Sequence, residues 1–159
     1  MGKLFRLAAL SIVFLFVIAT AISLMIPQHI RISRAINIFG TKDSIFSLIR
    51  DTGKWKEWHP AFMPSDQQKR IPLTHVALSS SSDSSLVVKL WQDQKKPVVN
   101  GWQIYHVSAD SLTLQWYMDF QLKWYPWQKF GSLFFESTYG ILMEQGLVNI
   151  RNRVQGMQH

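Results

Sequence analysis

The chain has 159 residues, enough for one domain and a short additional segment, and it contains no cysteine. The missing cysteines exclude disulfides and cysteine-ligated metals, and only 17% of the residues are charged, a low fraction for a fully soluble protein. The formal charge of +7 is spread over single residues and short pairs, so it gives no basic run of the kind that indicates a nucleic-acid partner.

The first 27 residues contain a long apolar segment. No charged residue occurs from Leu7 to Ile26, and Pro27 ends the run. About twenty residues of helix measure about 30 Å, which is the thickness of the hydrocarbon core of a bilayer. We therefore predict a single-pass membrane anchor over residues 1–27, followed by one domain over residues 28–159.

A cleaved signal peptide is the alternative for the same segment. Lys3 and Arg6 would form its charged start, and Ala19-Thr20-Ala21 resembles a small-residue cleavage site, although the apolar run continues beyond it. Positive charges flank the segment on both sides, so the positive-inside rule does not decide on which side of the membrane the domain lies.

The domain begins with a strand and two short helices. Isoleucines alternate with polar residues over 28–38, which predicts a half-buried strand that ends before Gly40. Thr41 is a suitable N-cap for a helix that ends at Gly53. A second helix over 54–58 runs into His59-Pro60, where proline disfavours further helix.

The middle of the chain predicts short strands separated by polar turns. A polar connection over 61–70 leads to a weak strand over 71–78, and a serine-rich loop over 79–85 follows. Two further strands are expected over 86–91 and 98–107. A turn over 93–97 joins them, and a tight connection over 109–111 follows the second.

The last strand, over 111–123, has the clearest pattern in the sequence. Six apolar side chains alternate with polar ones and face one way, namely Leu112, Leu114, Trp116, Met118, Phe120 and Leu122. Asp119 belongs to the opposite face.

A long helix is predicted to follow, from Trp127 to Val154, with Pro126 at its start. Its apolar positions at helical spacing are Leu133, Phe134, Met143, Leu147, Ile150 and Val154. Consecutive strands joined by short turns and closed by a helix favour an α+β fold with an antiparallel sheet.

Four stretches of the chain are similar to a known family. They are the helix after the first strand, over 43–49; the segment Trp55-Lys56-Glu57-Trp58-His59-Pro60, similar to a Trp-x-x-Trp-x-Pro motif; the last strand over 114–120; and the final helix with its Lys129-Phe130-Gly131 and its 144–147 segment. On these stretches residues 28–154 resemble the START-like, or SRPBCC, superfamily, in its polyketide cyclase/dehydrase and lipid-transport branch.

The resemblance implies a helix-grip fold, in which a curved antiparallel sheet wraps a long C-terminal helix with an apolar cavity between them. The sequence shows five strands, whereas the family usually has six or seven. We expect an apolar small molecule or lipid as ligand, and we expect no cofactor, metal or nucleic acid. The candidate ligand-binding residues are Trp58, Leu114, Trp116, Met118, Phe120, Met143 and Leu147.

The sequence contains no convincing catalytic set. The five histidines lack metal-ligand spacing, and no nucleophile elbow or phosphate loop occurs. His59 beside Glu57 is either an acid/base pair or a surface histidine held by Pro60. A cyclase or dehydratase that uses His59 or Asp119 as base is therefore an alternative to a binding module.

A non-catalytic interaction domain is the third possibility. Trp124, Tyr125 and Trp127 gather where the last strand meets the last helix. Such rings form either a packed corner of the domain or a contact with a partner or a membrane interface.

Overall fold

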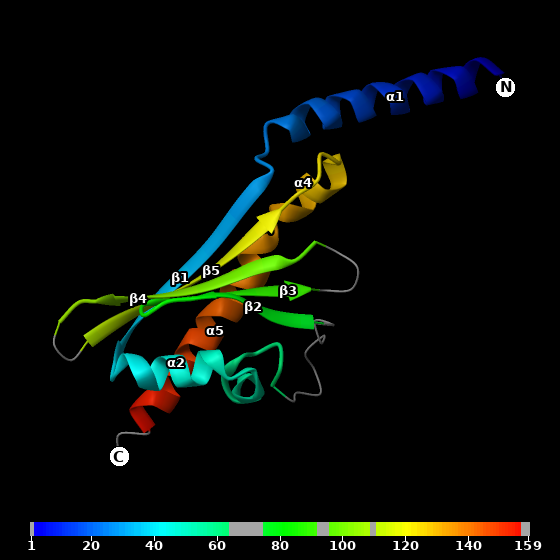
Figure 1. Ribbon diagram of the computed structural model, residues 1–159. Coiled ribbons are helices and arrows are strands. Elements are labelled where there is room, and N and C mark those ends of the chain that lie inside the picture. The colour runs from blue at the N-terminus through cyan, green and yellow to red at the C-terminus, as the bar shows by residue number, and fades with distance from the viewer. Residues whose placement is uncertain (1, 64–74, 92–95, 109–110, 157–159) are drawn as a thin grey trace.

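The computed structural model describes residues 2–63, 75–91, 96–108 and 111–156. Its elements in chain order are α1 (Gly2–Leu24), β1 (His29–Phe39), α2 (Lys42–Arg50), η1 (Thr52–Lys54), α3 (Trp55–Trp58), β2 (His75–Ser81), β3 (Ser85–Trp91), β4 (Val98–His106), β5 (Ser111–Gln121), α4 (Pro126–Ser132) and α5 (Phe135–Gly156). Figure 1 shows α1 projecting away from a domain made of one sheet and the remaining helices.

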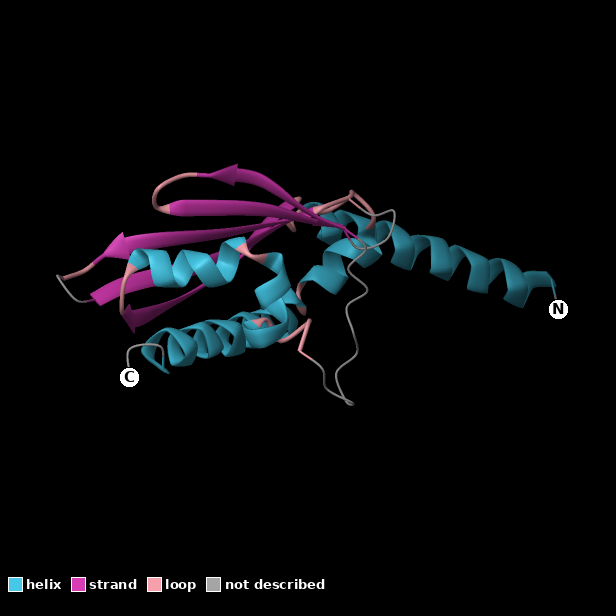
Figure 2. Ribbon diagram, turned by 60° about the horizontal axis from the view of Figure 1, so that its bottom comes forward, coloured by secondary structure: helices cyan, strands magenta, loops and turns pink. Residues whose placement is uncertain are grey.

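The sheet has five strands in the order β1-β5-β4-β3-β2, and each neighbouring pair is antiparallel. The chain therefore enters along one edge, and β5 returns to pair with β1. The helices α2 and α5 lie on the same side of this sheet (Figure 2). This arrangement is the predicted α+β helix-grip fold, preceded by one apolar helix.

Local sequence signals account for the helix that follows β1. Gly40 has a φ of 152°, which is strained for a residue with a side chain, and it turns the chain out of β1. The hydroxyl of Thr41 then accepts a hydrogen bond from the backbone N–H of Ser44 at 3.3 Å, as an N-cap does. The helix buries Ile45, Phe46, Leu48 and Ile49.

The helix α5 packs across the inner face of β1 and β5 because two glycines allow close approach. Gly140 faces the guanidinium of Arg34 on β1, and a β-carbon there would lie 2.6 Å from Nη2. Arg34 forms ion pairs with Glu136 and with Glu144, the latter at 2.6 Å. Gly146 faces Trp116, so α5 is fixed to the sheet by ion pairs at one position and by an aromatic ring at another.

The predicted long final helix is wrong in one respect, because the structure has two helices. The N–H groups of Leu133 and Phe134 bond to carbonyls three residues earlier, which tightens the chain into a turn between α4 and α5. Leu133 and Phe134 are 64% and 69% exposed, so they do not belong to the buried face that their spacing predicted. The turn leaves α4 beside α1 while α5 crosses the sheet (Figure 1).

The serine-rich segment is also more ordered than predicted. Residues 79–81 belong to β2 and Ser85 begins β3, so only 82–84 form the turn. The side chain of Ser82 accepts from the N–H of Ser85 at 3.0 Å, which replaces a backbone turn bond. Of the weak strand predicted over 71–78, residues 75–78 belong to β2, and residues 71–74 lie outside the described residues. Residues 64–70, 93–95 and 109–110 of the predicted connections also lie outside them.

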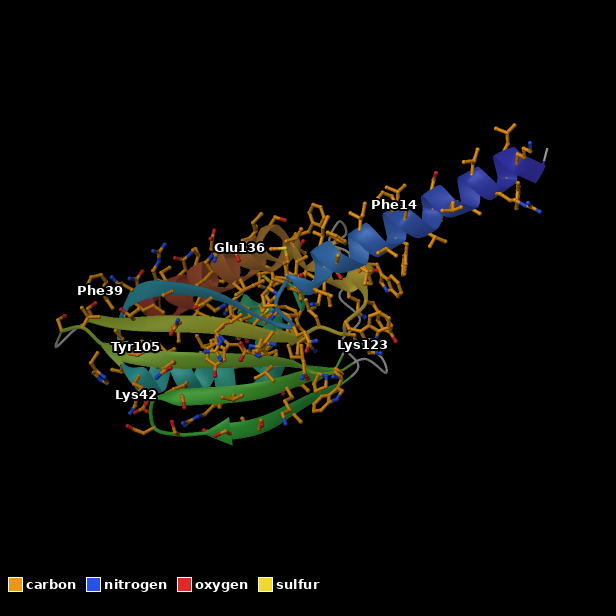
Figure 3. All side chains as sticks on the ribbon, turned by 90° about the horizontal axis from the view of Figure 1, so that it is seen from above. Phe14, Phe39, Lys42, Tyr105, Lys123 and Glu136 are labelled. Carbon is orange, nitrogen blue, oxygen red and sulfur yellow. The ribbon has the colours of Figure 1, made fainter. Side chains whose placement is uncertain are left out.

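The helix α1 is long and apolar enough to span a membrane, although a signal sequence near the N-terminus meets the same criterion. Its side chains, Phe14 among them, point outward along most of its length (Figure 3). Only its last turns are covered, where Ser23 is buried and Ala19 and Thr20 are half-buried.

Candidate functional site

The inner face of the sheet carries a cluster of aromatic side chains around Trp116, which we call the aromatic cluster. The ring of Trp116 lies 5.4 Å from Trp102, 5.9 Å from Trp58 and 5.2 Å from His59, measured between ring centroids. Trp55 and Phe62 complete the cluster by edge contacts with these rings. Strands β4 and β5 therefore supply two of the rings, and α3 with the residues that follow it supplies the others.

Every residue predicted to line a cavity is buried on this inner face, between the sheet and the helices. They divide between two places, because β5 carries Trp116 and Phe120 about 13 Å apart along the strand. Trp116 meets Trp58 in the aromatic cluster, whereas Phe120 packs on Phe135 and Tyr139 of α5 at 4.8 Å. The buried members are Trp58, Leu114, Trp116, Met118, Phe120, Met143 and Leu147.

Three polar side-chain atoms in the aromatic cluster are buried without a hydrogen-bond partner, among the residues that the structure describes. They are His59 Nε2, Asn100 Nδ2 and Trp102 Nε1. Each of the three residues contacts Trp116. Asn100 Oδ1 accepts from the Trp116 indole N–H at 3.1 Å, and the rings of His59 and Trp102 pack against the Trp116 ring. Buried polar groups in folded proteins nearly always have hydrogen-bond partners. Three unpaired atoms around one ring therefore distinguish this place from an ordinary core.

The other tryptophans of the cluster show the usual arrangement by contrast. The indole N–H of Trp55 donates to the Ile49 carbonyl at 2.8 Å, and that of Trp58 donates to the Leu48 carbonyl at 3.0 Å. Those two bonds connect α3 to α2 and satisfy both donors. The unpaired donors are therefore confined to the side of the cluster formed by β4 and His59.

His59 is neither of the two things that its sequence context predicted. It is 2% exposed rather than on the surface, and Glu57 binds Arg153 at 2.6 Å instead of the histidine. Burial lowers the pKa of His59 to about 3, so the ring is neutral near pH 7. The proposed acid/base pair fails because α3 turns the two side chains to opposite environments.

The neutral ring of His59 has a defined tautomer. Its Nδ1 accepts a hydrogen bond from the backbone N–H of Ala61 at 3.2 Å, so the proton is on Nε2. Nε2 is then a hydrogen-bond donor and not a base. Asp119, the other base considered, lies on the outer face, where Arg31 binds it at 2.6 Å and stacks on Tyr117.

Asn100 and Trp102 were not among the predicted site residues. The signal that marks them is parity, because positions 100, 102 and 104 of the strand predicted over 98–107 share one face. An asparagine on the buried face of a strand is costly unless something pairs with its amide. The sequence could have singled out Asn100 on this ground, but only the fold shows that its carbonyl oxygen is taken by Trp116.

The aromatic corner, defined as Trp124, Tyr125 and Trp127, packs within itself and is open to solvent. Tyr125 stacks on Trp127 with ring centroids 4.9 Å apart, and Trp124 leans on Tyr125 at the same distance. Trp124 is 56% exposed and Trp127 is 63% exposed. The corner is therefore not a packed corner of the domain core.

No family model and no curated relative matches the chain. Comparison of structures finds a START superfamily protein from Mycobacterium smegmatis, with a TM-score of 0.55, 15% identity, and coverage of 80% of this chain and 98% of that one. An aromatase/cyclase from Streptomyces matches with a TM-score of 0.50, 11% identity, and coverage of 82% and 96%.

Norcoclaurine synthase from Thalictrum, solved in complex with a transition-state analogue, matches with a TM-score of 0.53 at 8% identity, and the match covers 82% of this chain and 97% of that one. Identities this low show a shared fold and nothing more. The chain therefore has a START-like helix-grip fold, with an apolar N-terminal helix added before its first strand.

Proposed function

We propose that the chain is a membrane-tethered module that binds an apolar or amphipathic small molecule, such as a lipid, between its sheet and α5. The observation that carries the proposal is the inner face itself. It is lined almost entirely by apolar and aromatic side chains, yet in the described part of the chain it holds three buried polar atoms without hydrogen-bond partners. Buried polar atoms without partners are uncommon in native cores, and small-molecule sites combine an apolar lining with a few polar groups.

The fold supports the same conclusion. The structural neighbours include a START superfamily protein, an aromatase/cyclase and an enzyme that holds a transition-state analogue. We favour binding over catalysis for two reasons: Nδ1 of the neutral His59 ring already accepts a hydrogen bond from Ala61, and Asp119 is paired with Arg31 on the outer face. The proposed lining of the site remains the seven predicted residues Trp58, Leu114, Trp116, Met118, Phe120, Met143 and Leu147.

Native mass spectrometry of the full chain in nanodiscs of one defined synthetic lipid tests this function. We expect a bound molecule that differs in mass from the supplied lipid and that leaves on denaturation. If the only bound molecule is the supplied lipid, and it stays bound after the nanodisc is removed, that lipid is a ligand. Chain that is bare in every preparation contradicts the proposal.

We also propose a second role for the aromatic corner, as a contact with the bilayer surface beside the tether. The buried Lys129 of α4 donates from Nζ to the carbonyl of Ile26 at 2.6 Å, just beyond the end of α1. This bond holds α4 at the end of the apolar helix, where a bilayer passes from acyl chains to headgroups. Tryptophan and tyrosine favour that region because each ring has an apolar body and a polar tip.

Quenching of tryptophan fluorescence by lipids with brominated acyl chains tests the contact. In the full chain we expect strong quenching that the double variant Trp124→Ser with Trp127→Ser largely removes. Trp55→Phe is the control, since Trp55 is fully buried and its loss leaves the quenched fraction in place. Equal quenching of the double variant and the unchanged chain contradicts the contact.

A further inference from the structure

The three unpaired atoms of the aromatic cluster are all hydrogen-bond donors. His59 offers the N–H of Nε2 because its Nδ1 is already an acceptor for Ala61. Asn100 offers its amide N–H groups because its oxygen is held by Trp116. Trp102 has an indole N–H and no acceptor at all. Together they present hydrogen atoms and no lone pair, so only an acceptor can satisfy them.

These three residues, which we call the donor site, each contact the side chain of Trp116. Asn100 and Trp102 are two apart on β4 and so point to the same face of the sheet. Trp116 is opposite Trp102 in the neighbouring strand and touches His59 on the other side. The donor site is therefore bounded by β4, by the ring of Trp116 and by the segment after α3.

The donor site carries no formal charge near neutral pH. Burial keeps His59 neutral, and the other two donors are an amide and an indole. Moving a carboxylate or a phosphate into apolar surroundings without a cation is costly, whereas a neutral oxygen loses far less on desolvation. The chemistry thus selects a neutral acceptor over an anionic one.

We propose that the ligand of this domain is an apolar molecule with a neutral oxygen acceptor, such as a ketone, ester or amide carbonyl, which binds to the donors of His59, Asn100 and Trp102. The inference rests on the proposed binding function and names the class of molecule that the site takes. The apolar part of the ligand lies against the aromatic cluster, and the carbonyl oxygen accepts from the donor site. An ordered water is the competing occupant, since it can also accept from these groups.

Two matched pairs of probes separate these occupants. 1-Acetylnaphthalene and 1-isopropenylnaphthalene have nearly the same shape, methyl laurate and tetradecane have chains of equal length, and in each pair only the first has a carbonyl oxygen. Binding to the full chain in nanodiscs is measured by titration, with the indole N–H resonances of the ¹⁵N-labelled protein as the second readout and empty nanodiscs as the blank. We expect the carbonyl member to bind roughly tenfold more tightly, as one additional hydrogen bond allows.

The variant Trp102→Phe tests the donor itself. It removes the N–H and retains an aromatic ring, so we expect the preference for the carbonyl member to fall toward equality, and the resonance that the carbonyl probe shifts most to be absent. His59→Phe is a second variant, which retains a ring and removes the Nε2 donor, with the same expectation. The control is Tyr105→Phe, because Tyr105 is an exposed residue of the same strand, outside the aromatic cluster, whose hydroxyl donates to Gln115, and this variant retains the preference.

Each outcome has one meaning. Preference for the carbonyl member that Trp102→Phe removes supports the inference. Equal binding of both members of each pair leaves the binding function standing and overturns the donor site, which then holds water. Failure of all four probes to bind overturns the binding function, and the inference with it.

Discussion

At the scale of single residues, burial decides the chemistry of His59. A histidine beside a glutamate in sequence suggests proton transfer, but the ring packs among Trp55, Trp58 and Trp116. Apolar surroundings disfavour the charged form, and this effect exceeds any that a neighbouring carboxylate in the sequence could have. The consequence is a neutral donor inside the domain, which makes stability depend on pH.

The folded protein should lose stability as the pH falls below the ordinary pKa of histidine. The pKa of His59 is lowered from 6.5 to about 3, so between these values the unfolded chain binds a proton that the folded chain does not. Stability is therefore full above pH 6.5 and decreases toward pH 3, by about 2 kcal/mol at pH 5. Denaturant unfolding at pH 7 and pH 5 in one detergent measures the difference.

His59→Phe isolates this effect because it retains a ring and cannot titrate. We expect the variant to lose most of the pH dependence between pH 7 and pH 5. His106→Gln is the control, since His106 is exposed at the end of β4, and it should behave as the unchanged chain does. A decrease of equal size in His59→Phe would show that other groups are responsible.

At the scale of elements, the contact between α5 and β5 depends on a glycine. A β-carbon on Gly146 would lie 2.8 Å from Trp116 Cζ3 and 3.3 Å from Pro60 Cδ. The ring of Trp116 is enclosed by other rings and cannot move aside freely. Alanine at this position therefore forces the helix away from the sheet.

We expect Gly146→Ala to destabilise the domain by about 1–2 kcal/mol, because overpacking exceeds the gain in helix propensity. Gly131→Ala is the matched control, since it lies in α4 with no atom within 4 Å of its β-carbon. That control should be neutral or more stable by about 0.5–1 kcal/mol. Thermal unfolding of the two variants measures the difference. Equal stability of Gly146→Ala and Gly131→Ala would mean that α5 tolerates displacement from the sheet.

The buried face of α5 permits a second test. Leu147 is 1% exposed and Gln145, two residues earlier, is exposed. Leu147→Asp should cost several kcal/mol, roughly 3 or more, because it places an unpaired charge under the sheet. Gln145→Asp should remain within about 0.5 kcal/mol of the unchanged chain. Unfolding of Leu147→Asp at the unchanged temperature would show that the helix presents a different face.

At the scale of the whole molecule, the apolar helix α1 and the domain are connected through α4. The buried face of α4, formed by Pro126, Lys129 and Ser132, meets the last turns of α1 and the carbonyl of Ile26. Cleavage after Ala21 would remove the part of α1 that includes Ala19 and Thr20 and leave α4 partly uncovered. This packing favours a retained anchor over a signal peptide.

We expect the chain made in cells to retain its N-terminus and to stay in the membrane fraction after washing at high pH. The apolar span needs its full length of about twenty residues to cross the bilayer, so a retained helix holds the domain there. Intact mass measurement of the purified chain checks the first point directly. A mature mass that begins near residue 22 would show that the segment is a signal peptide.

Much of the fold follows from the sequence by local rules. Alternation over 111–123 and over 28–38 has a period of two because one face of each strand is buried, and β5 and β1 match these ranges within two residues. Thr41 acts as the predicted cap, and Asp119 faces outward as its parity requires. These features depend on neighbours in the chain, so a single sequence determines them.

Other features were decided by contacts between distant parts of the chain. The separation of α4 from α5, the burial of His59 and the pairing of Glu57 with Arg153 arise only when α3, α5 and the sheet are placed together. The donor site is the clearest case, because Asn100, Trp102 and His59 are ordinary residues until the fold gathers them around Trp116. Local periodicity reports which side of an element is buried, whereas only the tertiary structure determines what each buried atom meets.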